Sequence, residues 1–254
     1  MNDSMLHAGI RVPLPLRPSC AQCTARGVCL APGNGACERA PLDGLIRYRR
    51  RLARDEVLFR QDQPFAVIYV VRFGHLKSSR PDHRGHPRVT AFHMAGDLIG
   101  LDAIHSGRHA CSSVALEDSE VCEIPYARLQ EAMHDSPALL QRFQCALSCE
   151  IGREQAVLLQ TSMSGAARLA SLLLNLSARY VERGYSGRRF QLRMSRADMG
   201  DYLGLTFETI SRLLGRFRDA GWIKLDRREI ELLDLEQLQS LLDSAAELPL
   251  IDQC

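Results

Sequence analysis

Three cysteines gather near the beginning of the chain, where Cys20, Cys23 and Cys29 form a C-x2-C-x5-C array. Thiolates this close together repel one another unless a cation lies among them, so the spacing predicts a metal ion or an iron–sulfur cluster. Three cysteines leave one ligand to be found elsewhere in the chain. The candidates are Cys37, Cys111 and Cys122. Spacing alone does not choose among them, nor between zinc and iron.

A second group of residues lies toward the C-terminus and has the pattern of two short helices joined by a turn. Ser195 and Asp198 form an S-x-x-D capping box, which predicts a helix over residues 196–203. Gly204 permits a sharp bend after that helix, and Thr206 is a good N-cap for a second one. This arrangement is that of a helix-turn-helix.

The second of these helices has one apolar and one polar side. Arg212 can donate two hydrogen bonds to a guanine, Glu208 can accept from a cytosine amine, and Ser211 can meet a base edge or a thymine methyl. A surface helix of mixed charge is the alternative. The caps, the turn glycine and a hairpin pattern over 222–232 that resembles a wing favour a reader of the DNA major groove. The apolar residues recur at steps of three and four and predict the buried side: Ile210, Leu213, Leu214 and Phe217.

Charge is segregated around this helix pair. Residues 165–228 hold 13 Arg or Lys and 6 Asp or Glu, a net charge of +7, whereas residues 229–254 hold seven acids and no Arg or Lys. Such a basic block suits a polyanion, although a solvated charged face has the same composition.

The rest of the chain must position these two groups of residues. A length of 254 residues favours two domains, and composition separates four regions. These are a Cys-rich segment (1–41), short β-rich runs between regular turn signals (42–134), a long helix (135–163) and the helix-turn-helix region (164–254). The spacing of the short strands predicts an antiparallel barrel or jelly roll. We therefore expect an α+β protein with an N-terminal β-roll, a long helix and a C-terminal winged helix-turn-helix.

The compartment follows from what the sequence lacks. No segment approaches 18 uninterrupted apolar residues, and the first residues lack the pattern of a secretory signal. We expect a cytoplasmic protein without a membrane span, in which cysteines are free, redox-active or bound to metal rather than paired in disulfides.

The long helix carries a heptad-like stripe. Such a stripe can pack on the β-roll of its own subunit, but seams of this length more often meet the same helix of a second copy. We therefore predict a homodimer. The members of the stripe lie three or four residues apart: Leu140, Phe143, Leu147, Ile151, Glu154 and Leu158.

Taken in order, the cysteine array, β-roll, long helix and helix-turn-helix resemble the FNR branch of the CRP/FNR superfamily, which are oxygen-sensing regulators of transcription. The resemblance covers nearly the whole chain and rests most on residues 20–29, 92–97, 121–125 and 203–216. In that family an oxygen-labile [4Fe–4S] cluster is held by three N-terminal cysteines and one on the β-roll. The resemblance therefore implies Cys122 as the fourth ligand.

The resemblance also implies partners and contact residues. A homodimer would bind palindromic TTGAT-N4-ATCAA sites and contact RNA polymerase. The residues implied in DNA binding are Thr206, Glu208, Thr209, Ser211, Arg212 and Arg216.

Two features depart from the family pattern. Glu154 stands where the family commonly has aspartate, and this longer acid bears on how strongly two subunits repel. The turn over 84–88 resembles a polymerase-contacting loop, but it lacks the acidic residues expected there.

Three alternatives stay open. A regulator of the same superfamily that responds to cAMP or another effector would need a glutamate and a P-R-S-type run, whereas residues 100–111 offer only Arg108. A zinc-stabilised regulator is a second alternative. An iron–sulfur or zinc enzyme is the third, but no histidine or carboxylate stands in a recognisable constellation with the cysteines, so we expect no catalytic activity.

Overall fold

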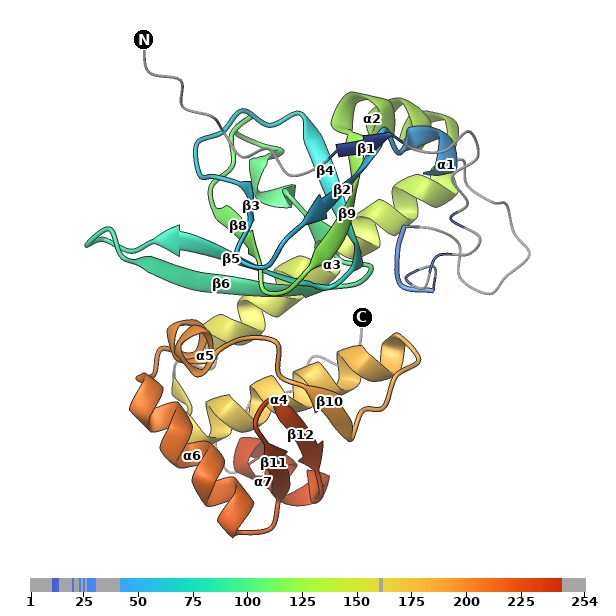
Figure 1. Ribbon diagram of the computed structural model, residues 1–254. Helices are drawn as coiled ribbons and strands as arrows, with labels where there is room; N and C mark the ends of the chain where they lie inside the picture. Colours follow the sequence, from blue (N-terminus) through green and yellow to red (C-terminus); the bar gives the residue numbers. More distant parts are fainter. Residues whose placement is uncertain are drawn as a thin grey trace. The chain divides into compact units, whose positions relative to one another are not determined.

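The computed structural model describes residues 11–13, 20, 23, 25, 27–30, 42–159 and 162–243. The chain divides into two compact units, residues 1–144 and 145–254 (Figure 1). None of the helices in the described residues is long and apolar enough to cross a membrane.

The first unit is a β-roll of two antiparallel sheets. One sheet has the strand order β1-β2-β9-β4-β7 and the other has β3-β8-β5-β6. The short helical segments are α1 (Leu42–Leu45) and η2 (Leu101–Ala103). The predicted β-roll is therefore confirmed. The strands are β1 (Arg11–Pro13), β2 (Tyr48–Leu52), β3 (Val57–Phe59), β4 (Val67–Phe73), β5 (His75–Pro81), β6 (Pro87–Met94), β7 (Leu98–Ile99), β8 (Ser112–Ala115) and β9 (Ser119–Pro125).

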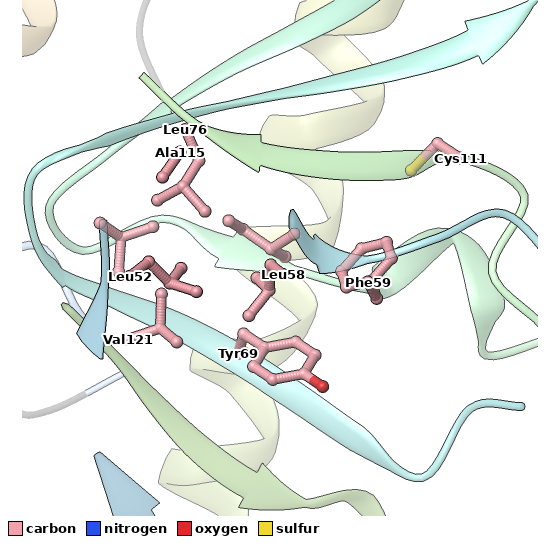
Figure 2. Packing of buried hydrophobic residues seen from close by; sticks show 10 residues of the cluster. Leu52, Leu58, Phe59, Tyr69, Leu76, Cys111, Ala115 and Val121 are labelled. Carbon is pink, nitrogen blue, oxygen red and sulfur yellow. The ribbon is translucent and has the colours of Figure 1, made fainter. Parts of the chain in front are cut away.

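The core of the β-roll lies between the two sheets (Figure 2). Alternate residues of each strand point inward, as the two-residue period of a strand requires. Burial on β4 and β9 does not alternate in this way, because residues 68–71 and 119–124 are all buried. Both faces of β9 must therefore be covered. The buried cluster comprises Leu52, Leu58, Phe59, Tyr69, Val71, Leu76, Ile99, Cys111, Ala115 and Val121.

Two helices follow β9: α2 (Tyr126–Asp135) and the long α3 (Pro137–Leu159), in which the division between the two units falls. Pro137 begins α3, a position where the missing N–H costs no intrahelical bond. The prediction that Phe143 belongs to the dimer stripe needs correction, because only 4% of this residue is exposed. This side chain is packed within its own chain and is not open to a partner helix.

The second unit is a winged helix-turn-helix, as predicted. The helix α4 (Gly165–Glu182) buries one apolar face, and α5 (Arg196–Leu203) and α6 (Phe207–Asp219) form the helix pair. A three-stranded antiparallel sheet of order β10-β12-β11 supplies the wing, and α7 (Leu235–Asp243) packs on α4. The strands are β10 (Arg189–Gln191), β11 (Ile223–Asp226) and β12 (Glu229–Leu232).

Candidate functional site

Hydrogen bonds fix both sides of the turn between α5 and α6. The Ser195 hydroxyl accepts from the Asp198 amide, and the Asp198 carboxylate accepts from the Ser195 amide, which completes the predicted capping box. The Thr206 hydroxyl accepts from the amide of Thr209 at the start of α6. Gly204 has a φ of 64°, a left-handed conformation that glycine adopts without strain. The local signals read from the sequence are all confirmed.

Gly200 allows α5 to lie directly against the turn. A Cβ atom at this position would lie 2.6 Å from the carbonyl oxygen of Leu205, closer than carbon and oxygen can pack. The Gly200 carbonyl in turn accepts from the amides of Gly204 and Leu205. The turn therefore rests on the backbone of α5, and this contact sets where α6 begins.

The solvent-facing side of α6 presents the predicted base-reading residues. Glu208 and Arg212 are exposed, whereas Ser211 is half-buried and accepts a 3.4 Å hydrogen bond from Arg196 Nη1. Hydrogen bonds from its own amide and from Thr206 lower the pKa of Glu208, so the side chain is a carboxylate acceptor at neutral pH. Arg216 is exposed one turn further along. The predicted buried face is confirmed at Ile210, Leu213, Leu214 and Phe217.

All four cysteines implied as cluster ligands line one cavity of the first unit. Cys20, Cys23 and Cys29 reach it from the N-terminal loop, and Cys122 reaches it from β9. Of the other candidates for the fourth ligand, Cys37 lies outside the described residues. The remaining lining residues are Ala25, Ile46, Val70, Val71, Arg72 and Ile124.

Backbone hydrogen bonds shape the loop that carries the first three thiols. The Cys23 amide donates to the Cys20 carbonyl at 3.1 Å, and the Cys29 amide donates to the Ala25 carbonyl at 2.9 Å. Ala25 and Leu30 are buried. The described part of the loop is therefore folded against the β-roll.

Cys122 lies on the outer face of its sheet. It is paired across the ladder with Arg49 on β2 and with Val70 on β4, and such pairs share a face. Its neighbour Val121 belongs to the core between the sheets. The outer face is apolar at Val70 and Ile124 because the cysteine loop covers it, which explains why β9 is buried on both sides.

The cavity is a poor environment for isolated thiolates. Burial, with smaller contributions from the nearby Cys29 and Cys23, raises the pKa of Cys122 to about 12 against the opposing charges of Arg49 and Arg72. A buried thiol of this kind gives up its proton when a metal cation takes the proton's place.

Four thiols are a donor set that both a structural zinc and a [4Fe–4S] cluster use. Among the described residues, no three His, Cys, Asp or Glu side chains are grouped so that they could hold one metal ion. A structural zinc needs four ligands around a single point, at about 2.3 Å for sulfur. In a [4Fe–4S] cluster each thiolate binds a different iron, so the four sulfurs surround a cavity.

Cys111, the other candidate for the fourth ligand, lies elsewhere. It belongs to the core between the sheets, and its thiol lies 3.4 Å from a carboxylate oxygen of Asp102. Burial, together with this carboxylate, raises the pKa of Cys111 to about 12. It does not line the cavity of the other four cysteines.

The predicted dimer stripe of α3 is mostly open to solvent beyond Phe143. Ile151 is 55% exposed and Leu158 is 68% exposed, and Glu154 is exposed between them. Leu140 is 39% exposed and Leu147 is half-buried. An apolar stripe of this kind can pair with another helix.

Arg72 and Glu120 are residues that sequence analysis did not identify. Arg72 lines the cysteine cavity, and its Nη1 donates to Glu120 Oε1 at 2.7 Å. The one sequence feature that could have indicated this pair is Glu120, a carboxylate in the same β-rich run as Cys122 and Ile124. A buried carboxylate needs a partner, but nothing in the sequence says which arginine supplies it.

Comparisons with known proteins agree with this architecture. A cyclic nucleotide-binding domain model matches residues 49–136, and a Crp-like helix-turn-helix domain model matches residues 167–241. The transcriptional regulatory protein btr of Bordetella pertussis is 43% identical over 234 residues, which are 91% of this chain and 97% of that protein. The fumarate and nitrate reduction regulatory protein of Escherichia coli is 38% identical over 223 residues, which are 87% of this chain and 89% of that protein.

A solved structure supports the same assignment. FixK2 from Bradyrhizobium japonicum is 28% identical, with a TM-score of 0.69 over 76% of this chain and 96% of that chain. The matched relatives are regulators of transcription rather than enzymes. The β-roll, the winged helix-turn-helix and an identity of 38% across most of both chains together show that this chain is a DNA-binding transcription regulator of the CRP/FNR family.

Proposed function

We propose that this regulator responds to oxygen through a [4Fe–4S] cluster held by Cys20, Cys23, Cys29 and Cys122. Four thiols from two distant segments of the chain line one cavity, and this observation carries the proposal. An oxygen-labile cluster would supply the response, because its loss removes the group that joins the N-terminal loop to β9. This chain is similar to the fumarate and nitrate reduction regulatory protein, and its own cysteine spacing fits the family pattern. Both observations support the same function.

The N-terminal loop contacts elements that lead to the dimer helix. A Cβ atom at Gly96 would lie 2.4 Å from Val28 Cγ2, so the loop packs against a glycine turn of the β-roll. Arg142 of α3 donates from Nη1 to the Leu30 carbonyl at 3.4 Å. Ordering of the loop therefore acts directly on the first turns of α3.

The active form is a homodimer paired through α3. Ile151, Leu158 and the less exposed Leu147 would bury apolar surface across a twofold axis, while the two Glu154 carboxylates would repel each other. Pairing places two copies of α6 about one DNA turn apart, which requires a palindromic site. We propose TTGAT-N4-ATCAA, with bases read by Glu208, Ser211 and Arg212, and RNA polymerase as the protein partner in the cytoplasm.

The supporting contacts on α6 have distinct roles. Thr206 and Thr209 lie at its first turn, where hydroxyls and free amides meet phosphates. Arg216 lies one turn beyond Arg212 and would contact phosphate rather than a base edge.

A cyclic nucleotide is a less suitable effector, although the matching domain model bears that description. In residues 100–111, the Asp102 carboxylate accepts from the amides of Ala110 and Cys111 at 2.7 and 3.2 Å. His109 is 3% exposed and stacks on Phe59 with ring centroids 3.7 Å apart. A carboxylate and a packed imidazole in this stretch oppose the binding of a phosphate.

The decisive experiment is anaerobic purification followed by an absorbance spectrum and assays of iron and sulfide. The proposal predicts a coloured protein with four irons and four sulfides per chain, which binds the palindrome and loses both colour and binding in air. A colourless protein with one zinc per chain would refute oxygen sensing and leave DNA binding intact.

A further inference from the structure

Strand alternation places Arg72 at the cysteine cavity. Arg72 lies two residues after Val70, which lines the cavity and pairs with Cys122, so the two-residue period of β4 puts both side chains on the same face of the sheet. The pairing of β4 with β9 shifts register between Val71 and Phe73, just beyond this point. Arg72 is itself one of the residues that line the cavity of the four cysteines.

Glu120 holds this guanidinium in position. Its side chain is only 5% exposed and accepts from Arg72 Nη1 at 2.7 Å through one oxygen and from Arg51 Nε at 3.3 Å through the other. Burial by itself would lower the pKa of Arg72, but the hydrogen bond and the charge of Glu120 raise it above its usual value. The Arg72 side chain is 31% exposed, whereas the Arg51 side chain is 70% exposed and does not line the cavity.

We propose that Arg72, positioned by Glu120, contributes a fixed positive charge to the cysteine site, and so affects how readily a bound cluster is oxidised. A [4Fe–4S] core with four thiolate ligands is negative overall, and removing an electron makes it less negative. A fixed positive charge beside it therefore favours the reduced form and opposes oxidation. This inference rests on the proposed function and adds a residue to it that is not a ligand.

Removing one or the other member of the ion pair should shift the reduction potential of the cluster in opposite directions. Arg72→Gln removes the positive charge, so the cluster should have a lower reduction potential and be lost faster in air. Glu120→Gln removes the neutralising carboxylate and keeps an acceptor for Arg72, so the potential should rise and loss should slow. A charge at this distance, partly screened, should change the rate of loss by roughly threefold to tenfold.

Arg51→Gln is the matched control. It removes an arginine from the same carboxylate, but from the side that faces solvent, and screening makes its effect small. Arg72→Lys keeps the charge and should restore most of the parental potential. Circular dichroism of each protein without metal establishes that the β-roll is folded.

The experiment compares the full-length proteins, purified without oxygen, by redox titration and by the decay of visible absorbance after air is admitted. Opposite shifts for Arg72→Gln and Glu120→Gln, with Arg51→Gln near the parent, support the proposal. If the parent holds a cluster and Arg72→Gln matches it in potential and decay, or if Arg51→Gln shifts as far as Arg72→Gln, the role of Arg72 is refuted and the cluster is not. A parent protein without iron and sulfide overturns both this inference and the proposed function.

Discussion

Replacing Gly200 by alanine should lower the stability of the helix-turn-helix, although alanine favours a helix more than glycine does. The added Cβ would lie 2.6 Å from the Leu205 carbonyl oxygen, and a backbone atom cannot rotate away as a side chain does. The turn must shift, at a cost of about 1–3 kcal/mol for an overpacked contact. For a domain of this size, each kcal/mol lowers the unfolding midpoint by roughly 4–8 °C. The displaced start of α6 should also weaken binding to the palindrome.

The matched substitution is Gly215→Ala in the middle of α6. Nothing lies within 4 Å of a Cβ at this position, so alanine should instead stabilise the helix, by up to about 1 kcal/mol. Trp222 reports the transition because it is the chain's single tryptophan and its ring lies 5.3 Å from that of Phe217 on α6. Thermal unfolding of the metal-free protein, followed by tryptophan fluorescence, should move in opposite directions for the two variants. Equal midpoints for Gly200→Ala and the parent would show that the contact does not constrain the turn.

Three further predictions test the other proposed sites. Cys122→Ser should lose iron and sulfide on anaerobic purification whereas Cys111→Ser should keep both, and full iron in Cys122→Ser would reassign the fourth ligand. Glu154→Ala removes two facing carboxylates and should favour dimers in air, so a variant that sediments as a monomer as completely as the parent would contradict the repulsion. Arg212→Ala should cost about 1–3 kcal/mol and relax preference at the guanine of each half-site, whereas Arg216→Ala should weaken all sequences alike and reduce the salt slope by about one. DNA titrations at several salt concentrations distinguish these two effects, and unchanged discrimination by Arg212→Ala would contradict its assignment to guanine.

Sequence alone was enough for the helix-turn-helix. The capping box at Ser195 and Asp198, the N-cap at Thr206 and the left-handed Gly204 all occur where the pattern predicted them. These signals are readable because capping and turn formation involve residues within four positions of one another. The period of the apolar residues likewise predicted which side of α6 is buried.

Other features were decided only by tertiary structure, because they depend on contacts between distant segments. Spacing could not indicate which further thiol lies near the first three. The register of β9 places Cys122 on the face that the loop covers, whereas Cys111, just before β8, lies in the core between the sheets. The heptad period placed Phe143 in a dimer seam, but a period of 3.5 does not distinguish a partner helix from the chain's own fold, and the fold buries this residue. The meeting of Arg72 with Glu120 depends on the pairing of β4 with β9, two strands that lie far apart in the chain, and a shift of one residue in that pairing would move the side chains to opposite faces.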